Sequence, residues 1–210
     1  MKTNSSEYAY LTDTTIQGDN SCISIGNASQ SVSQNNTPFY LQHTQETTKS
    51  KQLQIDSTIE RVAQWFLSLA PMSNKKLQKL CYYAYCWFIV FFNDKEVISY
   101  LNRNEIQTLC PEKFQAWIHG PVLPRLYHKY KEYGWHEIPQ IANKPIVEAG
   151  LESLLQQVWD AYGDFSADEL EILSHQEYPW QNARKGISNG DACSNEISDY
   201  DILQYYSALS

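Results

Sequence analysis

The sequence lacks a segment long enough to cross a membrane as a helix. Its one candidate is the apolar run from Leu80 to Phe92, which has 13 residues, whereas about 20 are needed to span the hydrocarbon of a bilayer. We therefore expect this run to form a helix buried at the centre of a globular core. Residues 1–20 contain no apolar signal segment, so we expect no export signal.

Cysteine is sparse and irregularly spaced. The chain has five cysteines, an odd number without the spacing of a disulfide framework. Two of them, Cys81 and Cys86, lie within the apolar run. We therefore expect reduced thiols and a cytoplasmic location.

The short motifs that mark metal, nucleotide and hydrolase sites are missing as well. The chain contains no Cys-x-x-Cys pair, no His-Glu-x-x-His, no acidic calcium loop, no glycine-rich phosphate loop and no Gly-x-Ser-x-Gly elbow. We expect no metal, no cofactor and no catalytic residue. One alternative is a small hydrolase that uses His175 with Ser174 or Glu177. Against it, neighbours on a helix diverge by about 100°, and a nucleophile needs its base within about 3 Å.

Basic residues are in the minority. The chain has 16 Lys and Arg against 24 Asp and Glu, a formal net charge of −8. Residues 56–210 hold 13 of the basic and 20 of the acidic residues, so the acidity belongs to the part with a folded pattern. This balance disfavours nucleic acid and favours a basic partner. Two small basic clusters keep a nucleic-acid-binding regulator as a second alternative: Lys75, Lys76 and Lys79, and Arg125, Lys129 and Lys131.

Residues 1–54 form a polar extension rich in Ser, Thr, Asn and Gln. A weak repeat with a period of eight residues occurs there, in Gly18–Ser21, Gly26–Ser29 and Gln34–Thr37. Such a segment either stays disordered or forms small β-arcs that need another copy to stack on. The extension is therefore a candidate route to a homo-oligomer.

From residue 55 onward, apolar residues recur at helical spacing. We expect an all-α or α-dominated domain, a bundle of about seven helices, over residues 55–210. The expected boundaries are Pro71 after the first helix, Ser73 as the cap of the next, a Ser166–Glu169 capping box, Pro179 at the start of a short helix and Ser198 as the last cap.

The segment from Phe114 to Gly134 has the most ordered layout of the chain. An aromatic lead-in is followed by a Gly120-Pro121 break and by tyrosines at helical spacing. We expect Pro121 and Pro124 in the first turn of a helix, where proline is tolerated. Tyr and Trp dominate interface hot spots, and the chain has 15 Tyr and six Trp. A protein–protein surface is therefore the leading functional interpretation.

Four blocks of this sequence resemble the Panacea (SocA-like) antitoxin domain of bacterial and prophage toxin–antitoxin pairs. The blocks are KLQKLCYYAYCWFIV from Lys76, FQAWIHGPVLPRLYHKYKEYG from Phe114, LSHQEYPWQNAR from Leu173, and the terminal stretch from Ile202 to Tyr206. They occur in the family's order, and the resemblance covers residues 59–209. Ser174 stands where threonine is usual. Two departures from the family's pattern are the polar N-terminal extension, which lies outside the domain, and a link, 93–112, that is longer than usual.

The resemblance implies an α-helical fold, no catalytic residue, and neutralisation of a toxin encoded beside this chain by direct complex formation. It also implies that members differ in their toxins, among them toxic relatives of small-alarmone synthetases, and that one member instead delivers its toxin to a protease. We expect the two motif turns to be fixed by Trp117, Gly120, Pro121, Pro179 and Trp180. We expect partner contacts from Lys79, Arg125, Tyr127, Tyr130, His175 and Arg184, with an acidic complement of Asp164, Asp168 and Glu171.

Overall fold

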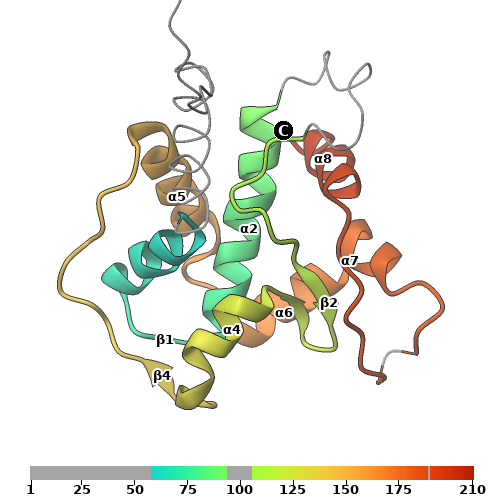
Figure 1. The fold of residues 1–210 in the computed structure, drawn as a ribbon, viewed down its shortest axis with the longest axis horizontal. Helices are drawn as coiled ribbons and strands as arrows, with labels where there is room; N and C mark the ends of the chain where they lie inside the picture. Colours follow the sequence, from blue (N-terminus) through green and yellow to red (C-terminus); the bar gives the residue numbers. More distant parts are fainter. Residues whose placement is uncertain (1–57, 94–105, 189) are drawn as a thin grey trace, which may run out of the picture. The chain divides into compact units, whose positions relative to one another are not determined.

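The computed structural model describes residues 58–93, 106–188 and 190–210. Within them the chain forms seven α-helices, one short 3-10 helix and two small two-stranded sheets (Figure 1). The prediction of an α-dominated domain is confirmed. The predicted polar extension and most of the long link lie outside the described residues.

The helices and strands have the following bounds. The first described helix covers residues 58–69. The other helices are α2 (Asn74–Phe92), α4 (Pro124–Tyr130), α5 (Ala149–Tyr162), α6 (Ala167–His175), α7 (Tyr178–Ala183) and α8 (Asp199–Ser207), with a 3-10 helix, η2, at Lys131–Tyr133. The strands are β1 (Met72–Ser73), β2 (Gln115–Trp117), β3 (Gly120–Val122) and β4 (Glu137–Ile138). Strand β1 pairs with β4, and β2 pairs with β3, both antiparallel.

Helix α2 is the centre of the core, as its apolar sequence predicts. It contacts α4, α5, α6, α8 and strand β3, and in Figure 1 α5 lies on one side of it and α8 on the other. Its start is fixed by Ser73, whose Oγ accepts the Lys76 amide at 3.2 Å. At its end, the Asn93 side chain donates to the carbonyls of Ile89 and Gln107 and accepts the Gln107 amide. No helix in the part of the chain that the structure describes is both long and apolar enough to cross a membrane.

The other predicted helix boundaries are confirmed. Ser166 and Glu169 form the capping box of α6, and Ser198 Oγ accepts the Asp201 amide at the start of α8. Pro179 lies in the first turn of α7. Each of these boundaries is set by a local contact, which is why the sequence alone indicates it.

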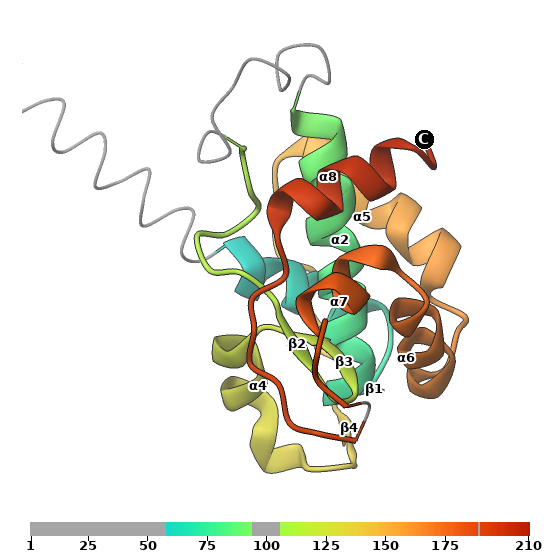
Figure 2. The same ribbon diagram turned by 90° about the vertical axis from the view of Figure 1, so that its right-hand side faces the viewer.

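The prediction for Pro121 was wrong. Pro124 begins α4, but Pro121 lies in β3, which forms a hairpin with β2 in the register Ala116 opposite Pro121. The hairpin turn ends at Gly120, whose φ of 92° is a conformation that favours glycine. Strands of three residues are too short for a period-two pattern to appear, so the sequence alone did not indicate the hairpin. Figure 2 shows the hairpin between α4 and α7.

Candidate partner-binding site around the motif junction

Three motifs that lie far apart in the sequence meet at one buried point, which we call the motif junction. It consists of Lys79 from α2, Gly120 and Pro121 from β3, and Ser174 from α6. Lys79 Nζ donates to the Pro121 carbonyl at 3.1 Å. A Cβ atom added to Gly120 would lie 2.6 Å from Lys79 Cε and 2.8 Å from Ser174 Oγ. Only glycine therefore fits between α2 and α6 at this position.

Lys79 is enclosed rather than presented at the surface. Its exposed fraction is 1 %, and among the described residues no carboxylate lies within ion-pair distance of its ammonium group. Burial lowers the pKa of Lys79 to about 7, because a charged amine loses its hydration without gaining a counter-ion. The contacts seen for this predicted partner-binding residue are thus internal.

Arg184 is also buried, at 4 % exposure, and joins the end of α7 to two loops. Its Nη1 donates to the Ala116 carbonyl at 2.9 Å, and its Nη2 donates to the carbonyls of Ser188 and Asp191 at 3.0 and 2.7 Å. These three acceptors are neutral. The guanidinium therefore organises backbone from β2 and from the segment after α7.

Trp180 connects the two predicted motif turns. Its Nε1 donates to the Trp117 carbonyl at 3.2 Å. One face stacks on the His175 ring with 4.0 Å between centroids, and Arg184 lies 5.1 Å from the ring centroid. Trp117 and Trp180 thus lie together at the hairpin. Whether they fix both turns, as the sequence predicts, stays a prediction.

A pocket of about 380 Å³ opens beside this stack. Its lining consists of His175, Trp180, Gln181, Arg184 and Ile187. The His175 Nε2 atom is enclosed and has no hydrogen-bond partner among the described residues. Burial lowers the pKa of His175, which favours the neutral imidazole.

Glu177 is a buried carboxyl group held by two phenols. Tyr83 Oη donates to it at 3.1 Å and Tyr206 Oη at 2.7 Å. Burial raises the pKa of Glu177 to about 7, although both hydrogen bonds act in the opposite direction. The group ties α7 to α2 and α8.

The alternative of a hydrolase requires His175 to pair with Ser174 or Glu177. Ser174 Oγ instead donates to the Glu171 carbonyl at 3.0 Å, and both Glu177 oxygens accept tyrosine hydroxyls. The three side chains thus have separate surroundings, and no nucleophile–base pair is formed. The part of the chain that the structure describes also contains no cluster of three or more His, Cys, Asp or Glu placed to hold a metal ion.

Two of the three predicted acidic contacts lie in one surface cluster. Lys75 forms ion pairs with Asp168, at 2.7 Å, and with Glu171. The hydrogen bond from Lys75 lowers the pKa of Asp168. Burial opposes the shift at Glu171, but Lys75 and His119 lower its pKa. Asp164 is exposed between α5 and α6.

Three of the predicted contacts, Arg125, Tyr127 and Tyr130, lie on α4. Arg125 Nη2 donates to Glu112 at 3.1 Å, and Nη1 donates to Glu60 at 3.4 Å. Tyr127 is half-buried and packs edge-on against Trp117, with ring centroids 5.1 Å apart. Tyr130, on the same helix, is buried at 8 % exposure.

The two basic clusters are largely occupied within the chain. Five of the six cations have internal partners: Lys75 with Asp168 and Glu171, Lys76 with the Gly163 carbonyl, Lys79 with the Pro121 carbonyl, and Arg125 and Lys129 with Glu60. A cation that already has a partner must give it up to bind phosphate. This observation counts against the nucleic-acid alternative.

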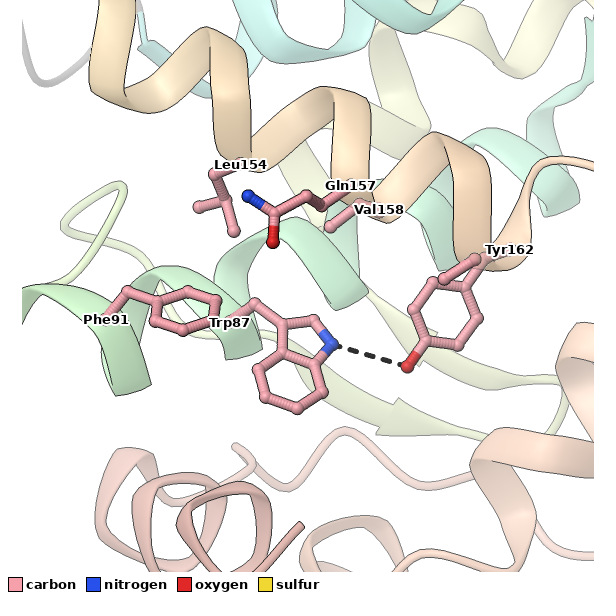
Figure 3. Close-up of a pocket in the computed structure, with 7 residues that line it drawn as sticks. Trp87, Phe91, Leu154, Gln157, Val158 and Tyr162 are labelled. Atoms are coloured by element: carbon pink, nitrogen blue, oxygen red, sulfur yellow. Dashed lines mark hydrogen bonds between the residues drawn. The ribbon is translucent and has the colours of Figure 1, made fainter. Parts of the chain in front are cut away.

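A further surface feature, a groove, is not indicated by the sequence. A groove of about 200 Å³ lies between α2 and α5, with Trp87 and Phe91 from α2 on one side (Figure 3). The sequence does not distinguish these two aromatic residues from core residues, because they belong to a run that is apolar on every helix face. The exposed fraction of Phe91, 57 %, indicates that this face of α2 is open to solvent, while Val90 on another face is buried.

Comparison with known proteins and protein families identifies the family to which these motifs belong. A search of curated proteins and a search of solved structures found no match to the chain. The family model described as "Antitoxin SocA-like, Panacea domain" matches residues 77–181, a range that includes Lys79, the Gly120-Pro121 turn and Trp180. The match covers half of the 210 residues. The resemblance found in the sequence is confirmed: this chain belongs to the SocA-like Panacea antitoxin domain family.

Proposed function

We propose that this chain is the antitoxin of a toxin–antitoxin pair and that it silences a toxin encoded beside it through direct protein–protein binding. Membership of the antitoxin domain family is the observation that carries the proposal. The contacts of three motif residues support it: Lys79 and Arg184 make internal bonds, and Ser174 Oγ donates to the Glu171 carbonyl instead of pairing with a base. The chain is thus proposed to act by binding, in the cytoplasm, without catalysis or a cofactor.

The predicted contact residues divide into two roles in this proposal. Lys79, Arg184 and Tyr130 are buried, and we assign them to holding the motif segments in place. Exposed or half-buried groups remain for the toxin, and we assign this contact to Asp164, Asp168, Glu171, His175, Arg125 and Tyr127. Complex formation silences the toxin if the antitoxin binds an inactive toxin state more tightly than the active one.

Co-purification tests the proposal. The full chain, carrying an affinity tag, is produced together with the product of the neighbouring gene, and the eluted complex is measured by size-exclusion chromatography with light scattering. We expect a complex of defined stoichiometry. An eluate that contains this chain alone would contradict the proposal.

Charge reversal at Asp164 tests the assigned contacts. Asp164 is exposed, and among the described residues no cation pairs with it. We expect Asp164→Lys to weaken the complex, because a basic partner would meet a like charge. Glu137→Lys, an exposed acid in β4, is the matched control and should bind as the unchanged chain does.

A further inference from the structure

The groove between α2 and α5 has an apolar interior and one polar bridge. Trp87 and Phe91, one turn apart on α2, stack with 5.7 Å between ring centroids. Opposite them, α5 supplies Leu154, Gln157, Val158, Ala161 and Tyr162, which recur at helical spacing. Figure 3 shows these two rows facing each other, with Trp87 Nε1 donating to Tyr162 Oη at 3.3 Å across one end.

The groove is built from side chains that the core itself holds in place. Tyr162 stacks on Tyr83 of α2, with 4.0 Å between ring centroids. The Tyr206 ring of α8 meets Trp87 edge-on at 5.3 Å. The walls are therefore anchored, while Phe91, Gln157 and Ala161 remain exposed at the opening. A preformed groove of this kind binds a partner without first ordering its own side chains.

The helices beside the groove are acidic. Helices α5 and α8 contain Glu152, Asp160, Asp199 and Asp201 and neither Lys nor Arg. Lys144 pairs with Glu152 and Lys113 with Asp199, whereas Asp160 and Asp201 have no ion pair among the described residues. Asp160, three residues after Gln157 on α5, is exposed and accepts a hydrogen bond from Gln156 Nε2 at 2.8 Å.

Helix ends add to this negative character. The last turns of α2 and α8 contain no basic residue, so the partial negative charge at these two C-terminal ends is not offset by a cation in the turn. At the end of α5, by contrast, Lys76 Nζ donates to the Gly163 carbonyl. The end of α8 adjoins the groove, since the Tyr206 ring contacts Trp87. The groove thus combines an apolar floor with a negative margin.

We propose that this groove binds an amphipathic, basic helix of the toxin. One apolar side chain of that helix enters between Phe91 and Val158, and its Lys or Arg residues face Asp160 and Asp164. The complementarity of a cationic helix to an apolar groove with an acidic margin favours this occupant over an acidic or neutral one. The inference rests on the proposed function, because it names the surface and the chemistry of the same partner.

Substitutions at the opening test the proposal on the full chain. The binding constant for the purified product of the neighbouring gene is measured by calorimetry. We expect Phe91→Glu to weaken binding by about tenfold or more, as loss of a central apolar anchor does. Trp135→Glu is the matched control, since Trp135 is an aromatic residue with 84 % exposure outside the groove. It should leave the constant within about twofold, as for a residue outside the contact.

A pair of substitutions at Gln157 separates charge from packing. Gln157 is exposed, so both variants should fold, which circular dichroism checks. We expect Gln157→Lys to weaken binding and Gln157→Glu to keep or strengthen it. Equal effects of the two would refute a basic occupant.

Two other results would overturn the groove proposal. If the unchanged chain binds and Phe91→Glu binds equally well, the groove is not the contact, while the proposed function stands. If Phe91→Glu instead turns a dimer of this chain into a monomer, the occupant is a second copy. Absence of binding by the unchanged chain would count against the proposed function itself.

Discussion

Replacement of Gly120 by alanine perturbs the motif junction at its tightest point. The added Cβ would lie 2.6 Å from Lys79 Cε and 2.8 Å from Ser174 Oγ, both well inside normal contact distance. Neither neighbour moves freely. Lys79 is held by its bond to the Pro121 carbonyl, and Ser174 by its bond to the Glu171 carbonyl.

Two effects add in this variant. A non-glycine residue at a φ of 92° is strained by roughly 1–2 kcal/mol. Insertion of a methyl group into a filled interior typically costs about 1–3 kcal/mol. We therefore expect Gly120→Ala to lower the free energy of unfolding by about 2–5 kcal/mol, a large part of the stability of a domain.

Gly186 provides the matched control. Its φ is 85°, but no atom lies within 4 Å of the position that an alanine Cβ would occupy there, so Gly186→Ala reports the backbone strain alone. Urea unfolding followed by circular dichroism gives both free energies, and equal slopes show that the same surface is exposed. If Gly120→Ala is no more destabilising than Gly186→Ala, the close contact of the three motifs is refuted.

The remaining predictions concern titration and capping. Between pH 4.5 and about 7 the folded state holds a proton on Glu177 that the unfolded state releases. The free energy of unfolding therefore falls by roughly 3 kcal/mol as pH rises through this range. Glu177→Gln should reduce this dependence on pH, as measured by urea titrations. From about pH 7 to 10.5 the unfolded state holds more protons on Lys79, so stability rises with pH, and Lys79→Met should remove the rise. Ser166→Ala removes the acceptor of the Glu169 amide and should lower stability by about 1 kcal/mol; an unchanged urea midpoint would show that the capping box contributes nothing.

Most helix boundaries could be predicted because each depends on a few neighbouring residues. A serine that accepts an amide three residues later, as Ser73 and Ser198 do, leaves its signature in the local sequence. The β2–β3 hairpin leaves no such signature in the local sequence. The Ala116 amide donates to the Asn195 carbonyl, and the Ala116 carbonyl accepts from Arg184. The segment is thus held by residues that lie far along the chain, which no local pattern reveals.

The sequence identifies residues of the candidate site but not their contacts, for a similar reason. Lysine and arginine are almost never fully buried, so the sequence favours Lys79 and Arg184 as surface contacts, whereas the contacts seen in the structure are internal. The sequence suggests Glu177 as a possible hydrolase residue. In the structure its carboxylate accepts two tyrosine hydroxyls, from α2 and α8, which lie far from it in the sequence. The groove at Phe91 depends on which face of α2 remains uncovered, and the packing of α5 and α8 decides this.

Bacterial growth directly measures whether this chain neutralises a toxin. Colony-forming units are counted in cells that produce the neighbouring gene product alone and in cells that produce it together with the full chain. We expect colonies to be lost in the first case and restored in the second. A neighbouring product that leaves growth unaffected, or growth arrest that this chain does not relieve, would show that this chain is not its antitoxin.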